Sequence, residues 1–196
     1  DYSIFDKYVA LCAEYGIDKQ INCFSMVPWD MNFRYWDEAA GTYKNIQTTT
    51  GTAEYRNLWN SFLTAFKAHL QEKGWFEKTN IAMDERAEAD MLNAYNIASA
   101  LGFNMALAGN YHSSLSDKLQ DFCVALGQDK KFTAEQRADR KAKNRVTTFY
   151  TSCADAEPNI YTNSFPAEAT FLPIYAAAND LSGYLHWAWI NWDEHP

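Results

Sequence analysis

The hydrophobic residues of the chain follow two alternating patterns. Apolar positions at helical spacing predict helices at residues 3–15, 52–73, 86–101, 133–144 and 167–181, with a brief one at 114–119. Short runs that are apolar on both faces predict buried strands at residues 21–27, 80–83, 103–108, 122–126, 146–150 and 183–189. The sequence therefore predicts an alternation of helices and strands.

Signals at the helix ends support this pattern. Ser3 is placed to cap the first helix, and Gly16 is placed to end it. Thr133 and Gln136 have the spacing of a capping box at the start of the helix at residues 133–144.

Strands that are apolar on both faces and separated by helices are typical of a parallel sheet covered by helices. Polar and aromatic residues gather just after these strands: Trp29, Asp30, Asp84, Glu85, Asn110, His112, Tyr150, Trp187 and Trp189. A (β/α)-barrel shows this asymmetry because its active site is built at the carboxyl ends of the strands. An open doubly wound sheet gives the same alternation, but no G-x-G-x-x-G or P-loop motif occurs at a strand-to-helix turn. We therefore predict an α/β fold of the TIM-barrel type.

The number of strands predicts an incomplete barrel. An eight-stranded barrel typically needs ~250 residues, whereas this chain has 196 residues and six predicted strands. Because the chain begins with a helix that lacks its strand, we expect strands three to eight here and the first two βα units before Asp1. We expect such a fragment to be stable only together with its missing amino-terminal part. The long loop at residues 28–53 predicts an extended insertion at residues 43–50.

Composition narrows the classes of ligand. The formal net charge of -8 argues against nucleic acid or an anionic membrane surface as partner. No apolar run approaches the ~20 residues of a membrane span. Aromatic residues make up 16% of the chain, more than a core alone needs, so some rings are expected to line a surface or cleft. A neutral ligand is the natural candidate.

The cysteines and the carboxyl-terminal acidic residues do not predict a metal site. Cys12, Cys23, Cys123 and Cys153 form no C-x-x-C pair and have no histidine at zinc spacing. We expect buried free thiols, because three lie in or at the end of predicted strands and one lies in a helix. The consecutive residues at positions 193–195, Asp, Glu and His, do not converge easily on one ion, and we interpret them as a solvated end.

The sharpest local feature is the pair Asp84 and Glu85, directly after a short buried strand. A purely structural interpretation is that Asp84 caps the next helix and Glu85 lies in its first turn. The functional interpretation is that they act on a sugar, because indole rings pack on the apolar face of a pyranose and amides, phenols and carboxylates bind its hydroxyls. Glycosidic cleavage also needs a carboxylic acid that protonates the leaving oxygen, and the longer reach of Glu85 favours it for this role.

The segments N-I-A-M-D-E at residues 80–85 and G-Y-L-H-W-A-W-I-N-W at residues 183–192, with the strand and helix order between them, resemble the catalytic domain of glycoside hydrolase family 123. The resemblance covers essentially the whole chain. It implies a retaining β-N-acetylgalactosaminidase whose barrel follows an amino-terminal β-sandwich domain, with the acidic pair at the end of barrel strand four. Arg86 departs from the pattern at a position where the resemblance implies Pro, and we expect the chemistry to survive this change.

The resemblance also implies substrate-assisted chemistry. Glu85 is then the acid that protonates the glycosidic oxygen and later activates water. Asp84 hydrogen-bonds the N–H of the substrate's 2-acetamido group, orients its carbonyl oxygen onto the anomeric carbon and stabilises the oxazolinium intermediate. A protein nucleophile would instead be expected on another strand, ~5 Å from the acid.

Seven further residues are candidates for substrate binding, and some of them have a competing structural interpretation. Tyr150 is a candidate donor to the acetamido oxygen, or else a tyrosine of the core rim. Trp187 is expected in the wall or floor of a sugar pocket beside Trp189, with packing in the barrel core as the alternative. The other candidates are Asn110 and His112, as partners of hydroxyl groups, and the loop aromatics Trp29 and Tyr161, at the rim.

The leading functional prediction is removal of terminal β-linked N-acetylgalactosamine from a glycan or glycolipid, without metal or cofactor. Preference for N-acetylglucosamine, which differs only at the C4 hydroxyl, is one alternative, and a non-catalytic carbohydrate-binding barrel is another. The resemblance implies export to the periplasm or cell surface of a bacterium, with a signal upstream of Asp1.

Overall fold

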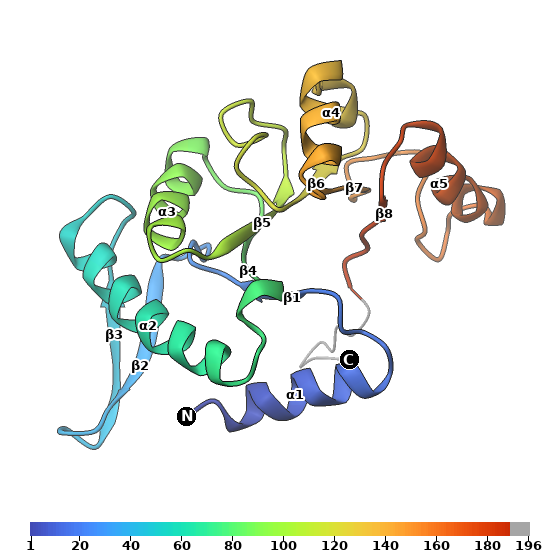
Figure 1. Cartoon of the computed structure of the whole chain (residues 1–196). Helices are drawn as coiled ribbons and strands as arrows, with labels where there is room; N and C mark the ends of the chain where they lie inside the picture. Colours follow the sequence, from blue (N-terminus) through green and yellow to red (C-terminus); the bar gives the residue numbers. More distant parts are fainter. Residues whose placement is uncertain (189–196) are drawn as a thin grey trace. The chain divides into compact units, whose positions relative to one another are not determined.

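The computed structural model describes residues 1–188, which fall into two compact units, Asp1–Ala106 and the part from Leu107 onward. Six strands form one sheet in the order β1-β4-β5-β6-β7-β8 (Figure 1). The pairs β1/β4, β6/β7 and β7/β8 are parallel. In the part of the chain that the structure describes, this order has β1 at one end and β8 at the other, as expected for an incomplete TIM-type barrel.

The first unit alternates helices and strands up to the middle of β5. Its elements are α1 (Ser3–Glu14), β1 (Ile21–Phe24), β2 (Asn32–Asp37), β3 (Thr42–Gln47), α2 (Ala53–Glu72), the 3₁₀ helix η1 (Phe76–Lys78), β4 (Thr79–Met83), α3 (Glu88–Ala100) and the first half of β5 (Asn104–Gly109). Every residue of β4 is buried. The hydroxyl of Tyr55 in α2 donates a 2.8 Å hydrogen bond to the carbonyl of Met26, which fixes the chain just after β1.

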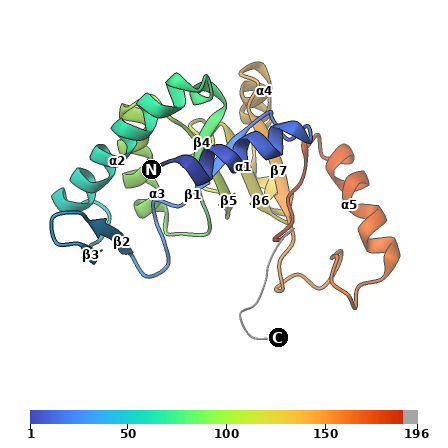
Figure 2. The ribbon, with the colours of Figure 1, turned by 90° about the horizontal axis from the view of Figure 1, so that it is seen from below.

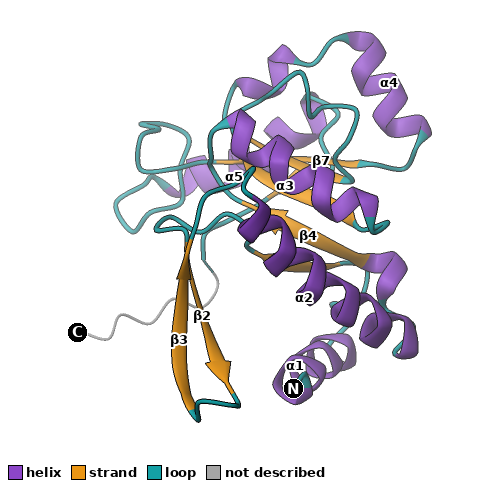
Figure 3. Cartoon of the chain, turned by 90° about the vertical axis from the view of Figure 1, so that its left-hand side faces the viewer, coloured by secondary structure: helices purple, strands orange, loops and turns teal. Residues whose placement is uncertain are grey.

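The insertion at residues 28–53 contains an antiparallel hairpin of β2 and β3, which extends away from α2 in Figure 3. Asn32 pairs with Gln47 at its base, and Asp37 pairs with Thr42 next to its turn. The ring of Tyr43 packs edge-on against Trp36 and also lies 4.0 Å from the guanidinium carbon of Arg34. Most residues of both strands are exposed.

The second unit continues the alternation. It contains the second half of β5, then β6 (Asp121–Ala125), the 3₁₀ helix η2 (Gln128–Lys131), α4 (Ala134–Ala142), β7 (Val146–Tyr150), α5 (Pro166–Ala178) and β8 (Gly183–Tyr184). A long loop at residues 151–165 joins β7 to α5 (Figure 2). Phe149 of β7 packs with Leu172 and Ala176 of α5 in a buried cluster.

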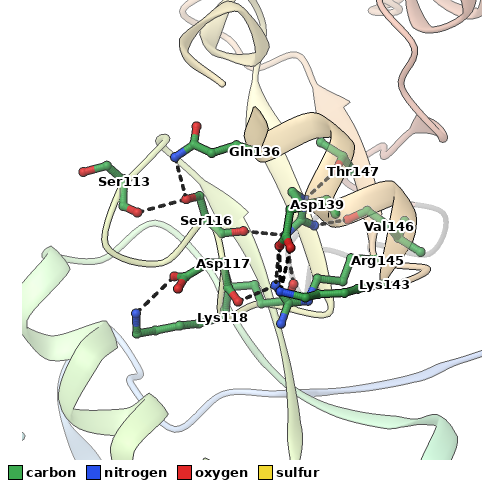
Figure 4. Close-up of polar contacts among 12 residues, drawn as sticks. Ser113, Ser116, Asp117, Lys118, Gln136, Asp139, Lys143, Arg145, Val146 and Thr147 are labelled. Carbon is green, nitrogen blue, oxygen red and sulfur yellow. Dashed lines mark hydrogen bonds and ion pairs between the residues drawn. The ribbon is translucent and has the colours of Figure 1, made fainter. Parts of the chain in front are cut away.

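Arg140 fastens α4 to the strands of this unit and is only 2% exposed. Its guanidinium donates hydrogen bonds to the carbonyls of Ser116, Leu119 and Val146 and to the hydroxyl of Thr147. Burial lowers the pKa of Arg140 to about 10. Figure 4 shows the surrounding contacts, in which Gln136 bonds Ser116 and the carboxylate of Asp139 meets Lys143 and Arg145.

Most predicted elements are confirmed. All six strands and the five longer helices occur, and both halves of the capping box of Thr133 and Gln136 are present. The predicted brief helix at residues 114–119 is wrong, because this stretch forms turns. The final strand is shorter than predicted and ends at Tyr184, while residue 189 of the prediction lies outside the described residues.

Three smaller predictions are also wrong or incomplete. Ser3 is the first residue of α1 and not its cap, since Tyr2 precedes the helix without a capping side chain. The insertion was predicted as extended only at residues 43–50, whereas the structure has two strands. All four cysteines are free, but only Cys123 is buried, and Cys153 is exposed because it lies in the loop after β7 and not in the strand.

Candidate active site

The acidic pair lies on a short connection between β4 and α3. Asp84 directly follows the buried strand and is half-buried, whereas Glu85 is exposed. Helix α3 begins at Glu88, its N-cap is Ala87, and no side chain caps it. Asp84 therefore does not cap the helix, and Glu85 does not lie in its first turn. The interpretation of the pair as helix-capping residues is wrong.

Arg86 is the main neighbour of this pair. Its Nη1 atom lies 2.9 Å from Oδ1 of Asp84 and donates a 2.7 Å hydrogen bond to the backbone carbonyl of Glu85. Its Nε atom donates a 2.7 Å hydrogen bond to the carbonyl of Val27. The residue that departs from the expected Pro thus connects the segment after β4 to the segment after β1.

Trp29 lies on the loop after β1, as predicted. The guanidinium carbon of Arg86 is 3.5 Å from the centroid of the Trp29 ring, a close cation–π contact. Trp29 remains 77% exposed, so one face of the ring holds Arg86 while much of its surface stays open. Its predicted contact with substrate stays a prediction.

In the second unit, Asn110 lies just after β5 and is exposed. The side chain of Gln128 donates a hydrogen bond to Oδ1 of Asn110 and accepts one from the backbone N–H of Tyr111. The amide of Asn110 is therefore held from the η2 segment and is not freely rotating. His112 follows in the same loop, is half-buried, and accepts a hydrogen bond from the N–H of Leu115 at its backbone carbonyl.

Tyr150 is the last residue of β7, as predicted, and its side chain is half-buried. Its carbonyl accepts a 2.9 Å hydrogen bond from the N–H of Leu126, which fixes the end of the strand against the chain after β6. Tyr161 lies in the long loop between β7 and α5 and lines an open hollow together with Asp155, Glu157 and Glu168.

Trp187 is 84% exposed, so it does not pack in a core within the described residues. Trp189 lies outside the described residues. The predicted roles of both rings in sugar binding stay predictions.

Three residues near the end of β7 form a hydrogen-bonded network that the sequence analysis missed. The hydroxyl of Thr151 donates to Oδ1 of Asn159 at 3.0 Å, and the Tyr184 hydroxyl lies 2.6 Å from the same Thr151 oxygen. Because the proton of Thr151 is used on Asn159, Tyr184 is the donor in the second bond. Burial raises the pKa of Tyr184, which keeps its hydroxyl protonated. The one available signal was the polar pair Thr151 and Ser152 directly after a strand.

Within residues 1–188, no group of three or more His, Cys, Asp or Glu side chains is arranged to hold a metal ion. No helix in this range is long and apolar enough to cross a membrane.

The comparisons with known proteins identify the chain. The family model described as "Glycoside hydrolase 123, catalytic domain" matches residues 1–196. A search of the curated proteins finds no match. A solved structure, presented as a family 123 glycoside hydrolase from Clostridium perfringens in a study of glycolipid glycan hydrolysis, is 32% identical with a TM-score of 0.86. The similarity covers 96% of this chain and 35% of that one, so the chain spans about a third of its length. The chain belongs to glycoside hydrolase family 123.

Proposed function

We propose that this chain carries the catalytic acids of a retaining glycoside hydrolase that removes terminal β-linked N-acetylgalactosamine by a substrate-assisted mechanism. The observation that carries the proposal is the position of Asp84 and Glu85 in a family 123 catalytic domain. They lie directly after a fully buried strand and take no part in capping α3. A rigid strand end is a suitable support for groups that must be held in a fixed orientation.

Glu85 is the general acid and base in this proposal. It gives its proton to the glycosidic oxygen as the bond from that oxygen to the anomeric carbon breaks. The carbonyl oxygen of the substrate's own acetamido group then bonds to the anomeric carbon and forms an oxazolinium ion. Glu85 next takes a proton from water, the water oxygen attacks the anomeric carbon, and the acetamido group is regenerated. Two inversions give overall retention of configuration.

Asp84 supports the attacking acetamido group. Its carboxylate accepts a hydrogen bond from the acetamido N–H, which turns the carbonyl oxygen toward the anomeric carbon and stabilises the positive charge of the oxazolinium ion. Adjacent residues suit these two tasks because the tasks fall on different parts of one sugar ring.

The solved relative, whose study concerns glycolipid glycans, supports the choice of substrate class. We propose a glycan or glycolipid with a terminal β-N-acetylhexosamine as the substrate, and an exported protein at the cell surface or in the periplasm of a bacterium. Asn110, His112, Tyr150, Tyr161 and Trp187 are proposed as substrate contacts.

A hydrolysis assay with the full-length protein tests the function. Aryl N-acetyl-β-galactosaminide should be cleaved, aryl N-acetyl-β-glucosaminide should be cleaved more slowly, and aryl β-galactoside, which lacks the acetamido group, should not be cleaved. Faster cleavage of the glucosaminide would favour the alternative sugar. Cleavage of the aryl β-galactoside would exclude substrate assistance. If none of the three substrates is cleaved, the non-catalytic carbohydrate-binding barrel is the favoured alternative.

A thiazoline analogue of the oxazolinium ion provides an independent measurement. It should inhibit competitively and bind more tightly than the substrate, because it resembles a species close to the transition state. Failure to bind would contradict the proposed intermediate.

A further inference from the structure

Arg86 is a buried cation on a surface connection. Its side chain is only 8% exposed, although it follows the exposed residue Glu85. A buried guanidinium needs partners for its charge and its N–H groups. It finds them in the carboxylate of Asp84, the carbonyls of Val27 and Glu85, and the ring of Trp29. Two connections that follow different strands therefore meet at one side chain.

The two sides of the Asp84 carboxylate have different surroundings. Oδ1 is buried and accepts no hydrogen bond within the described residues, and the Arg86 Nη1 atom lies 2.9 Å from it. The side chain of Asp84 as a whole is nevertheless 38% exposed. Because Oδ1 contributes almost nothing to that exposure, the exposed surface lies on Oδ2 and the methylene group. One oxygen is held against the arginine, and the other faces outward.

We propose that Arg86 is a positioning residue that fixes the orientation of Asp84. The ion pair holds Oδ1 inward, so that Oδ2 is presented to the acetamido N–H of the substrate. Arg86 acts through Asp84 and does not contact the sugar. This inference rests on the proposed function, because a fixed orientation of the Asp84 carboxylate matters for catalysis only if Asp84 acts on the acetamido group.

The shape of the guanidinium suits this role. Its planar fork donates along fixed directions, whereas the ammonium of a lysine is a single point of charge on a flexible stem. The Nε bond to Val27 and the Trp29 ring hold the plane, and Nη1 then has a defined position relative to Asp84. A lysine at this position keeps the charge but lacks the planar group that the Val27 bond and the Trp29 ring hold in place.

The experiment measures kcat and KM of the full-length protein on aryl N-acetyl-β-galactosaminide. Arg86→Gln should lower kcat roughly 10- to 100-fold, the size of effect expected from a misplaced reacting group. KM should change less than kcat, because Arg86 itself does not contact the sugar and the orientation of Asp84 matters most in the transition state. Arg86→Lys should recover part of the lost kcat. The control is Arg34→Gln, which removes another arginine stacked on an aromatic ring, in the β2–β3 hairpin, and should leave kcat unchanged.

A double-mutant cycle distinguishes positioning from a general structural effect. In an Asp84→Asn background, Arg86→Gln should reduce kcat by less than about threefold, because the residue through which it acts is already disabled. If the two losses multiply instead, Arg86 acts independently of Asp84 and the proposal is wrong. Circular dichroism of each variant establishes that it is folded, and Arg86→Lys replaces Arg86→Gln in the cycle if the glutamine variant is not.

The outcomes separate this inference from the proposed function. If the wild-type protein cleaves no acetamido substrate, or if Asp84→Asn has normal activity, the proposed function fails and the inference fails with it. If Asp84→Asn is severely impaired while Arg86→Gln has normal kcat, the proposed function stands and only the positioning role is overturned.

Discussion

Two aspartates of the first unit show how the surroundings of a carboxylate separate a stabilising role from a chemical one. Asp6 in α1 lies 2.7 Å from the ammonium of Lys73 and 2.6 Å from Nε2 of His69. Both of its oxygens are engaged by cationic or potentially cationic partners. Asp84 has such a partner on one oxygen and an exposed surface on the other. Asp6 is therefore suited to holding α1 on α2, and Asp84 to meeting a ligand.

Replacing Glu85 tests its proposed role as the proton donor. Glu85→Gln in the full-length protein should lower kcat on the acetamido substrate by roughly 10²- to 10⁴-fold, because an amide cannot transfer the proton. The loss of kcat should be smaller for substrates whose leaving group is a very acidic phenol, since such a phenolate departs with less need of protonation. Steady-state kinetics with two aryl leaving groups measures both effects.

Glu88→Gln is the matched control for this substitution. Glu88 lies three residues later, in the first turn of α3. Its replacement should leave kcat within about twofold of wild type, as is usual for a side chain away from the reacting atoms. Equal losses at both positions would remove the specific role of Glu85.

The contacts of Asp6 with Lys73 and His69 should make the stability of the protein depend on pH. The hydrogen bond from Lys73, with a further contribution from His69, holds the pKa of Asp6 below its ordinary value of 3.8. A lowered pKa in the folded state means that the stabilisation is fully present above the unfolded value and is lost as the pH falls through the folded value. Asp6→Asn should therefore lower the melting temperature at pH 7, and the difference from wild type should shrink below pH 3.8.

Thermal unfolding between pH 7 and pH 2 checks this dependence. Asp18→Asn is the control, because Asp18 lies 3.7 Å from the highly exposed Lys19 and such a surface pair contributes little. A melting-temperature difference for Asp6→Asn that does not vary with pH would show that the pair does not stabilise the fold through its charge.

At the scale of elements, Arg140 decides how α4 packs on its neighbours. It joins the helix to three backbone carbonyls and one hydroxyl, and two of these acceptors, the carbonyls of Ser116 and Leu119, are on buried residues. Arg140→Met should lower the free energy of unfolding by roughly 3 kcal/mol, because buried carbonyls are left without a donor. The free energy of unfolding of Arg140→Lys should lie between those of the wild type and Arg140→Met, because one ammonium group cannot reach the acceptors on both sides of the guanidinium site.

Urea unfolding measures these differences. Lys141→Met is the control, since Lys141 is the next residue of the same helix and its side chain is 77% exposed. Its effect should stay within about 0.5 kcal/mol. A methionine variant at position 140 as stable as wild type would mean that apolar packing replaces the hydrogen bonds without loss.

The elements also show what the sequence pattern predicts well. Strands such as β4, whose apolar residues 81–83 are all buried, could be recognised without a structure. The pattern predicts the extended segment that contains most of β3 but not β2 or the hairpin, because both strands are mostly exposed and their burial shows no period of two. Residues 114–119 show helical spacing because Leu115 and Leu119 are four positions apart. In the structure both leucines are buried, but the stretch forms turns and not a helix.

The acidic pair of the candidate site was predictable for a similar reason, since it directly follows a recognisable strand. The contacts of Arg86 were not predictable. Its partners Val27 and Trp29 come from a segment nearly sixty residues earlier, and only the parallel pairing of β1 and β4 brings the two strand ends together. No local pattern contains such a contact.

For the whole molecule, the exposed apolar side chains of α1 predict its behaviour in solution. Ile4, Tyr8 and Leu11 are all more than half exposed. Their spacing of four and three residues places them on one face of the helix, and an exposed apolar face often marks a place where another surface is bound. We expect the 196-residue chain on its own to bind the dye ANS and to self-associate, and the double variant Ile4→Ser, Leu11→Ser to do so less.

Sedimentation velocity and dye fluorescence check this expectation. Ile174→Ser is the control, because Ile174 lies on α5 and is 57% exposed but belongs to another helix. A monomeric chain without dye binding, or an equal effect of the control substitution, would contradict a specific role of the α1 surface.

The β2–β3 hairpin has a consequence for how this fold varies in evolution. Asn32 and Gln47 pair at its base, and the N–H of Thr48 donates a 3.3 Å hydrogen bond to the carbonyl of Met31. The hairpin therefore begins and ends at adjacent points, whatever the length of the segment between them. Insertions, deletions and loop exchanges in this segment should be tolerated without disturbing β1 or α2, so we expect its length to differ among homologues more than that of the strands on either side.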